Sequence, residues 1–250
     1  MAAIVIKSHE LPTADRAMLA RELVPGVAVF GGLALNAASC GGLNVDAVRN
    51  TIALGGKIIW LPTVSAANHQ AYVARKTALD HVRNLSTSNA IVHVCDSSGR
   101  VLSKLDRILD LIAEADVVLA TGHLSPQEAA AVCSRARELG VRRILVTHPE
   151  MSFIAMDLPT QRDLAAPGVM FERCYVTLLM DRVPARTIVD SIRAIGAAST
   201  ILATDLGQAA NPPATEGLRD YWLALSRAGL TVEEWRQMAV ENPAAFLNLT

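Results

Sequence analysis

The stretch DVVLATGHLSPQE, residues 116–128, decides the fold class. After Asp116, the residues Val117–Ala120 form an apolar run, with two β-branched valines, that is typical of a buried strand. A short polar turn follows, and then Ser125 supplies an N-cap, Pro126 the first helical position and Glu128 the third. A buried strand that runs through a short turn into a capped helix predicts one repeat of an α/β fold.

The same alternation recurs along the chain. We expect strands at residues 3–7, 27–35, 57–61, 116–120, 143–146, 169–175 and 200–203, each followed by helix. Strands that alternate with helices form a parallel sheet buried on both faces. A chain of 250 residues suits one such domain. The sequence therefore predicts an α/β fold, a TIM-type (β/α)8 barrel over residues 1–250, here with seven strands and the first strand missing.

One segment breaks this rhythm. Residues 65–100 contain His69, a polar stretch, a short apolar run and the turn Asp96–Gly99. We interpret them as a long insertion after the third strand, with a small hairpin. Long loops in compact domains are usually functional, so this insertion is expected to lie near the site.

The composition excludes several function classes. The net charge of −1 gives no electrostatic footprint for nucleic acid, and no apolar run is long enough to span a bilayer. Four widely spaced cysteines indicate reduced thiols and a cytoplasmic protein. The expected partner is a small-molecule substrate, and aromatic helix faces near Tyr221, Trp222 and Trp235 suggest a homo-oligomer.

Residues that bind metals or move protons follow the apolar strands. In parallel barrels the carboxyl ends of all strands meet on one face, where the active site lies. Residues distant in sequence would therefore meet in space. The residues in question are Lys7 and His9 after the first strand, His123 after the fourth, His148 after the fifth, Glu172 in the sixth and Asp205 after the seventh.

Two imidazoles and a carboxylate suit a borderline divalent cation. Zinc is the first expectation, and manganese, iron or nickel would also accept nitrogen and oxygen ligands. Such a cation makes water a nucleophile at neutral pH. We expect His123, His148 and Asp205 as ligands, with Asp205 also taking the proton of the water. Each residue alone could be a turn or capping residue, and only their joint position favours a metal site.

The remaining candidates have weaker signals. Lys7 could anchor a substrate charge, bridge metals or form a structural ion pair. Glu172 could bind substrate, or it could pair with Arg173 or Arg143. A last group is expected to line or cover the substrate pocket: Trp60 and Thr63 at the end of the third strand, and His69 in the insertion.

With these residues in place, the chain resembles the amidohydrolase superfamily of metal-dependent hydrolases. The closing segment 241–249, ENPAAFLNL, is similar to that family's Asn-Pro-Ala-x-x-Leu-Gly-Leu helix, with Asn248 in place of glycine. The resemblance implies that His123, His148 and Asp205 end strands five, six and eight of a barrel. It further implies metal-dependent hydrolysis of an amide, lactone or ester bond. A decarboxylase or lyase of the same superfamily and an inactive ligand-binding barrel are the alternatives.

Two features depart from the family pattern. No His-x-His motif of a first strand is present, and Pro62-Thr63 stands where strand four usually ends in a bridging Lys or Glu. Three explanations compete: the native chain begins upstream of Met1, His9 and Lys7 substitute for the missing ligands, or the chain is a metal-free relative. We favour the first, and we keep His9 as a candidate metal ligand.

Overall fold

A computed structural model describes residues 2–80 and 90–249 of the chain. The chain divides into two compact units, Met1–Ile144 and Leu145–Thr250. In the part that is described, β1 and β2 form a two-stranded sheet, and β3 to β8 follow one another in chain order in a six-stranded sheet. The strand pairs β1-β2, β3-β4, β4-β5 and β7-β8 are all parallel. The expectation of an α/β fold with parallel strands is therefore confirmed.

Unit 1 contains short buried strands that match the predicted apolar runs. Ile58 in β4 pairs with Gly32 in β3 and with Val118 in β5, so these three strands are in register. β3 to β5 are buried along their whole length. The strands are β1 (Ala3–Val5), β2 (Ala28–Phe30), β3 (Gly32–Ala34), β4 (Ile58–Trp60) and β5 (Val118–Ala120).

The run 27–35, predicted as one strand, is two strands interrupted at Gly31. Thr13 is the cause. Its backbone N–H and its hydroxyl both donate to the Gly32 carbonyl, while the Gly32 N–H donates to the Thr13 hydroxyl. A Cβ atom on Gly31 would overlap the Thr13 carbonyl, so glycine is required for this close approach. β2 consequently pairs with β1, and β3 pairs with β4.

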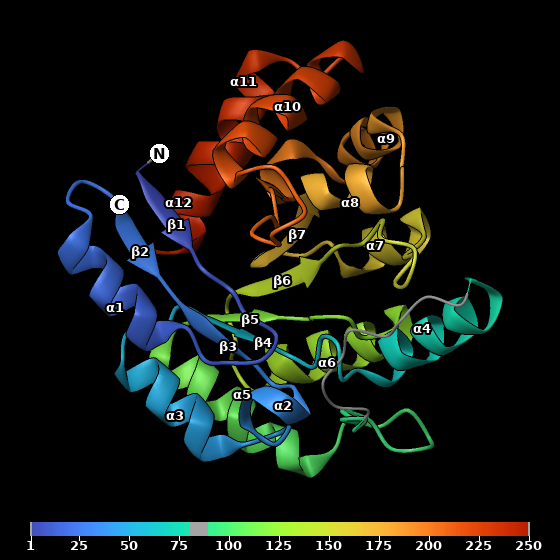
Figure 1. The fold of residues 1–250 in the computed structure, drawn as a ribbon. Coiled ribbons are helices and arrows are strands. Elements are labelled where there is room, and N and C mark those ends of the chain that lie inside the picture. The colour runs from blue at the N-terminus through green and yellow to red at the C-terminus, as the bar shows by residue number, and fades with distance from the viewer. Residues whose placement is uncertain (1, 81–89, 250) are drawn as a thin grey trace. The chain divides into compact units, whose positions relative to one another are not determined.

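Helices cover the strands of unit 1. In α5 the side chains of Leu105, Ile108, Leu109 and Ile112 are fully buried, at the spacing of one helical face. α3 and α5 lie side by side against β3 and β5 (Figure 1). The helices are α1 (Ala14–Leu23), α2 (Ala37–Cys40), α3 (Val45–Ala53), α4 (Ala67–Asp80), α5 (Ser103–Ala115) and α6 (Pro126–Glu138).

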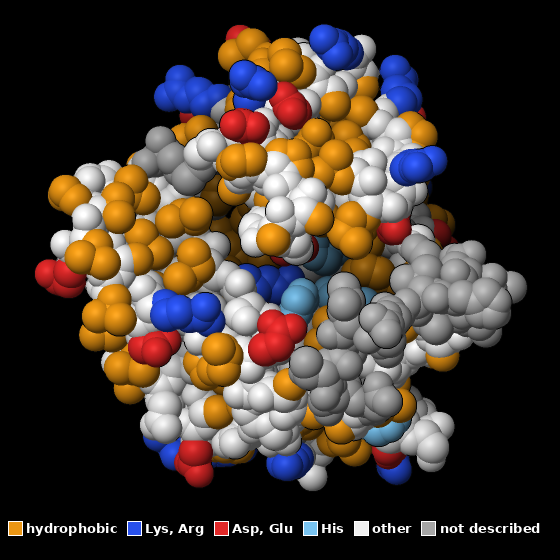
Figure 2. Space-filling view, in the orientation of Figure 1, with side chains coloured by type: hydrophobic (Ala, Val, Ile, Leu, Met, Phe, Trp, Pro, Cys, Tyr) orange, Lys and Arg blue, Asp and Glu red, His pale blue; other side chains and the backbone are white. Residues whose placement is uncertain are grey.

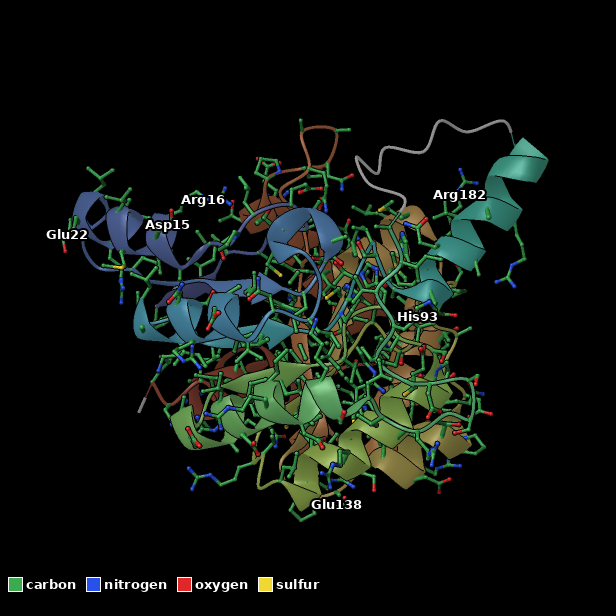
Figure 3. All side chains as sticks on the ribbon, turned by 90° about the horizontal axis from the view of Figure 1, so that it is seen from below. Asp15, Arg16, Glu22, His93, Glu138 and Arg182 are labelled. Atoms are coloured by element: carbon green, nitrogen blue, oxygen red, sulfur yellow. The ribbon has the colours of Figure 1, made fainter. Side chains whose placement is uncertain are left out.

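α1 is packed loosely compared with α5. Only Ala14 and Ala17 are buried, whereas Leu19 and Leu23 are 65% and 80% exposed. Hydrophobic side chains gather over this part of the surface in Figure 2, and exposed charged residues such as Arg16 line the same helix in Figure 3. The small buried face explains why the contact of Thr13 with Gly32 matters for holding α1 in place.

The insertion at 65–100 contains a helix that the sequence did not reveal. α4 begins at Ala67, after a short loop that follows the third predicted strand, and residues 81–89 lie outside the described part of the chain. Ala66 bridges to Val92 in parallel, and Cys95 bridges to Val101 in antiparallel fashion. The second bridge encloses the turn Asp96–Gly99, where the sequence predicts a small hairpin.

Unit 2 has the same alternation of strands and helices. Its core is a cluster around Tyr221, Leu225 and Met238, which are completely buried. The strands are β6 (Ile144–Thr147), whose first residue belongs to unit 1, β7 (Val169–Cys174) and β8 (Thr200–Ala203). The helical segments are α7 (Leu158–Leu164), α8 (Tyr175–Met180), α9 (Ala185–Ile195), η1 (Ala197–Ser199), α10 (Ala214–Arg227), α11 (Val232–Arg236), η2 (Gln237–Glu241) and α12 (Asn242–Phe246).

Of the three aromatic residues behind the expected homo-oligomer, Tyr221 is buried, and Trp222 and Trp235 are half-buried. Tyr221 is completely buried, and its ring contacts those of Tyr175 and Trp235, while Trp222 also packs on Trp235. The reason given for a homo-oligomer is thus wrong for Tyr221, and the homo-oligomer itself stays a prediction. None of the helices in residues 2–80 and 90–249 combines the length and hydropathy needed to cross a lipid bilayer.

Candidate functional site

In unit 1 the ends of four strands meet. His9 follows β1, Asn36 follows β3, Thr63 follows β4 and His123 follows β5. Nδ1 of His9 lies 2.8 Å from Oγ1 of Thr63, and Nδ2 of Asn36 donates to the same Oγ1 at 2.7 Å. The rings of His9 and His123 are 5.7 Å apart between centroids, edge to face. Within this unit, the structure thus brings His9, Thr63 and His123 together.

The backbone at Gly122 brings His123 to this point. Gly122 has φ of 61°, and a Cβ atom there would overlap the Leu61 and Pro62 carbonyls at the end of β4. The next residue, His123, donates its backbone N–H to the Pro62 carbonyl at 3.0 Å. Only glycine combines the left-handed conformation with such a close approach. The Gly-His pair therefore sets the position of the imidazole against the neighbouring strand.

His69 from α4 contacts His123 directly. The two Nδ1 atoms are 3.0 Å apart, and the ring centroids are 4.8 Å apart. His123 is buried, and burial lowers the pKa of His69 to about 4. One ring must donate and the other accept, because both imidazoles cannot present a proton to each other. His69, expected in a surface or substrate loop, is thus a partner of a candidate metal ligand.

Lys7 and Trp60 are also brought together. The Lys7 ammonium lies 5.7 Å from the centroid of the Trp60 ring, within the range of a cation–π interaction. Trp60 is 4% exposed, and its Nε1 is buried with no hydrogen-bond acceptor among the described residues. Both residues therefore stand at the strand ends where the sequence placed them, with a cationic group over an aromatic face.

Asn36 is the residue that the sequence analysis missed. It is fully buried, and its Oδ1 accepts the backbone N–H groups of Thr63 and Ser65 at 2.8 and 3.1 Å. Its Nδ2 donates to the His9 carbonyl at 2.9 Å. The signal was present, since Asn36 directly follows an apolar strand like the other candidates. A single amide thus fixes the loops after β1, β3 and β4 to one another.

In unit 2 the candidate ligands His148 and Asp205 form a pair. His148 follows β6, Asp205 lies shortly after β8, and Nε2 of His148 is 3.2 Å from Oδ2 of Asp205. The imidazole is 2% exposed and the carboxylate 25%. Both residues have a backbone φ of 50°, a left-handed conformation that is uncommon for residues other than glycine. Such backbone outliers cluster at functional sites.

Glu172 takes part through its backbone, whose carbonyl accepts the His148 N–H at 3.1 Å. The two arginines considered as its ion-pair partners each contact another carboxylate. Arg173 pairs with Glu150 at 3.1 Å, and Arg143 pairs with Asp116 at 2.7 Å. The Arg173–Glu150 pair is buried, and Nη2 of Arg173 donates to Gln161 at 2.7 Å. This buried pair is a structural feature of unit 2.

The pair of His148 and Asp205 has the chemistry of a divalent-cation site. Two ligands at about 2.0–2.1 Å in tetrahedral geometry are roughly 3.3 Å apart, close to the 3.2 Å between these atoms. Within neither unit do three or more described His, Cys, Asp or Glu side chains form a group that could hold a metal ion. The pair therefore supplies two suitable donors, and a complete site needs further ligands.

A model for a protein family matches residues 1–172, more than half of the chain, and its description is "Family of unknown function (DUF6282)". The chain belongs to this family. No curated protein sequence matches it. The DUF6282 match includes all of unit 1 and reaches into β7, so it contains His123 and His148 but not Asp205.

Solved structures share the fold. A metallo peptidase from Rhodobacter sphaeroides, bound to a phosphinate mimic of a dipeptide, matches with a TM-score of 0.61 and 14% identity over 99% of this chain and 68% of its own. An amidohydrolase from Pseudomonas aeruginosa matches with a TM-score of 0.61 and 12% identity over 98% and 78%. A 2,6-dihydroxybenzoate decarboxylase matches with a TM-score of 0.57 and 11% identity over 95% and 76%. These likenesses confirm the amidohydrolase-type fold.

Proposed function

We propose that this chain is a metal-dependent hydrolase that cleaves an amide, lactone or ester bond in a small molecule. The contact between Nε2 of His148 and Oδ2 of Asp205 carries the proposal. An imidazole and a carboxylate meet at the carboxyl ends of parallel strands, where enzymes of this architecture hold their reacting groups. Both residues also adopt a costly backbone conformation, which is retained where side chains must be aimed.

His148 and Asp205 would hold the cation, and the sequence pattern adds His123 as a further ligand. Zinc is our first choice, with manganese, iron or nickel as alternatives. When bound, the cation supplies Lewis acidity, which polarises a carbonyl group and makes water a stronger acid at neutral pH. We assign no bridging ligand to the strand at 57–61, because Pro62-Thr63 follows it in place of Lys or Glu.

Asp205 is the proposed proton carrier. Its carboxylate is 25% exposed, so a water molecule can reach it, whereas the imidazole of His148 is 2% exposed. We assign to Asp205 the proton of the attacking water and its delivery to the leaving nitrogen or oxygen. Nε2 of His148 lies 3.2 Å from the carboxylate, so both side chains would face the same cation, with Nε2 as a ligand. Proton transfer by a positioned carboxylate contributes about 10²- to 10⁴-fold to a rate.

Substrate contacts are proposed for the group in unit 1. Lys7 above Trp60 presents a positive charge that would attract a carboxylate or other anionic group of the substrate. Thr63 and His69 act indirectly, since each contacts a histidine at a strand end. Glu172 stays a proposed substrate contact. A small molecule with a hydrolysable carbonyl and an anionic group is therefore the substrate class to test first.

The test begins with metal analysis of the purified full chain, before and after incubation with Zn²⁺ or Mn²⁺. A panel of lactones, amides and esters follows, assayed in H₂¹⁸O. We expect metal retention, ¹⁸O in the acid product, and at least a ~10²-fold loss of rate in Asp205→Asn. Asp190→Asn on the exposed side of α9 is the matched control and is expected to behave as wild type.

Three results would contradict the proposal. Activity that survives both chelation and Asp205→Asn would remove the cation and the carboxylate from the reaction. A reconstituted protein that retains no metal would favour a ligand-binding barrel. Release of CO₂ without ¹⁸O incorporation would assign the chain to decarboxylation instead.

A further inference from the structure

The hydrogen bonds around Thr63 determine where His9 carries its proton. The first step is the orientation of the Asn36 amide. Its Oδ1 receives two backbone N–H groups, from Thr63 and from Ser65, and a backbone N–H can only donate. The other end of the amide is therefore the nitrogen. It donates to the His9 carbonyl and to the Thr63 hydroxyl.

The second step concerns the Thr63 hydroxyl. Thr63 is completely buried, so water does not reach the group. Throughout residues 2–80 and 90–249, the atoms that hydrogen-bond Oγ1 of Thr63 are Nδ2 of Asn36 and Nδ1 of His9. The amide of Asn36 donates, so the hydroxyl proton has one acceptor, which is Nδ1 of His9. If Nδ1 carried a proton, Oγ1 would face two donors and its own proton would be buried without an acceptor.

We infer that His9 is a neutral imidazole protonated on Nε2, fixed in this state by Thr63 and Asn36, and that it donates a hydrogen bond to a substrate oxygen rather than binding the metal. A protonated Nε2 has no lone pair for a cation, and Nδ1 is occupied by the hydroxyl. A doubly protonated ring also carries a proton on Nδ1, so it would likewise leave the Thr63 hydroxyl proton without an acceptor. This assignment replaces the sequence-based expectation of His9 as a ligand.

The position of His9 suits a donor role. It lies at the end of β1, with its ring 5.7 Å from that of His123, at the strand ends where the substrate is proposed to bind. A neutral N–H donor favours a carbonyl or carboxylate oxygen. The substrate part of this inference rests on the proposed function, whereas the tautomer follows from the hydrogen bonds alone. The two parts can therefore fail separately.

The tautomer is measured by two-bond ¹H–¹⁵N correlation spectra of the imidazoles in the full chain at pH 7.5. His9→Gln identifies the His9 signals by their loss. We expect a bare Nδ1 and a protonated Nε2. An Nδ1–H or doubly protonated His9 in the wild-type protein would overturn the inference, whatever the variants do.

Two substitutions at position 63 test the cause. Thr63→Ser keeps the hydroxyl, and we expect it to keep the Nε2–H form. Thr63→Val keeps the branched shape and removes the hydroxyl proton, so we expect a mixture of tautomers. An unchanged single tautomer in a folded Thr63→Val would contradict the role of the hydroxyl.

Two probes test the role of the ring. Zn²⁺ added to the wild-type protein is expected to shift the His148 signals and to leave the Nε2 proton of His9 in place. Loss of that proton on Zn²⁺ addition would make His9 a ligand and overturn the inference. If no imidazole responds to Zn²⁺, the metal proposal fails while the tautomer result stands. Acetate is the carboxylate probe, and a His9 N–H signal that moves no more than in matched chloride would refute the donor role.

Discussion

His148 and Asp205 share the same left-handed backbone conformation, with φ of 50° at each, while their side chains meet at 3.2 Å. For a residue other than glycine this conformation costs roughly 1–2 kcal/mol. The two residues follow different strands, so two separate backbone segments are strained where the side chains meet. Stability is given up here to direct an imidazole and a carboxylate toward each other.

Because of this strain, we expect the protein to be more stable with glycine than with alanine at position 205. Asp205→Gly and Asp205→Ala both remove the carboxylate, so their difference reports the backbone. We expect the free energy of unfolding, measured by urea denaturation, to be about 1 kcal/mol higher for Asp205→Gly than for Asp205→Ala. Position 190, inside α9, is the matched control. There we expect the free energy of unfolding to be about 1 kcal/mol higher for Asp190→Ala than for Asp190→Gly. Equal stability of the two variants at 205 would show that its backbone is unstrained.

The buried ion pair of Arg173 and Glu150 predicts a large effect on stability. The arginine is completely buried and the carboxylate is 7% exposed. Arg173→Met leaves a carboxylate in the interior without its cation, so we expect the free energy of unfolding to fall by about 3–5 kcal/mol. Arg186→Met, which breaks an exposed pair with Asp190, is expected to change it by less than about 0.5 kcal/mol.

A double variant separates the ion pair from packing. Replacing Glu150 and Arg173 together by Met removes both charges, and we expect it to recover much of the stability lost in Arg173→Met. A double variant that is as unstable as the sum of the two single variants would show that the pair contributes mainly through shape.

The pair of Asp106 and Arg135 predicts a pH effect in unit 1. Hydrogen bonds from Arg135 at 2.9 Å lower the pKa of the Asp106 carboxyl. A lowered folded-state pKa gives stability that is present above the unfolded pKa of about 4 and is lost as the pH falls further. We expect Asp106→Asn to lower the urea midpoint slightly at pH 7, with the difference shrinking as the pH falls below about 4. A difference that grows on acidification would contradict this sign.

Local sequence signals predicted the elements whose causes are local. The Ser125–Glu128 capping box begins α6 as expected, because both of its hydrogen bonds lie within four residues. The break at Gly31 was not predicted, because Thr13 causes it from 18 residues away. α4 was missed because its residues carry no clear apolar stripe, and so the periodic signal of a buried face is weak.

The candidate site divides in the same way. The convergence of strand ends follows from the parallel fold, and it predicted the meeting of His148 with Asp205 and of His9 with Thr63. Which atom donates and which accepts each hydrogen bond could not be predicted from the sequence. The His9 tautomer depends on which atom of Asn36 faces two backbone N–H groups, and the contact of His69 with His123 depends on where α4 begins.

The four thiols predict an order of reactivity. Burial raises the pKa of Cys133 to about 12, and Cys174 is also fully buried, whereas Cys40 and Cys95 are partly exposed. Burial also raises the pKa values of Cys40 and Cys95. Because the thiolate is the nucleophile, a thiol of pKa about 12 offers roughly 10³-fold less thiolate at pH 8 than a thiol with the ordinary value of 9. We expect a disulfide reagent to modify Cys95 and Cys40 in the native protein and all four thiols in guanidinium chloride. Cys133→Ala is then expected to remove one slow thiol and no fast one. Loss of a fast thiol in that variant would mean that unit 1 opens around α6 in the native state.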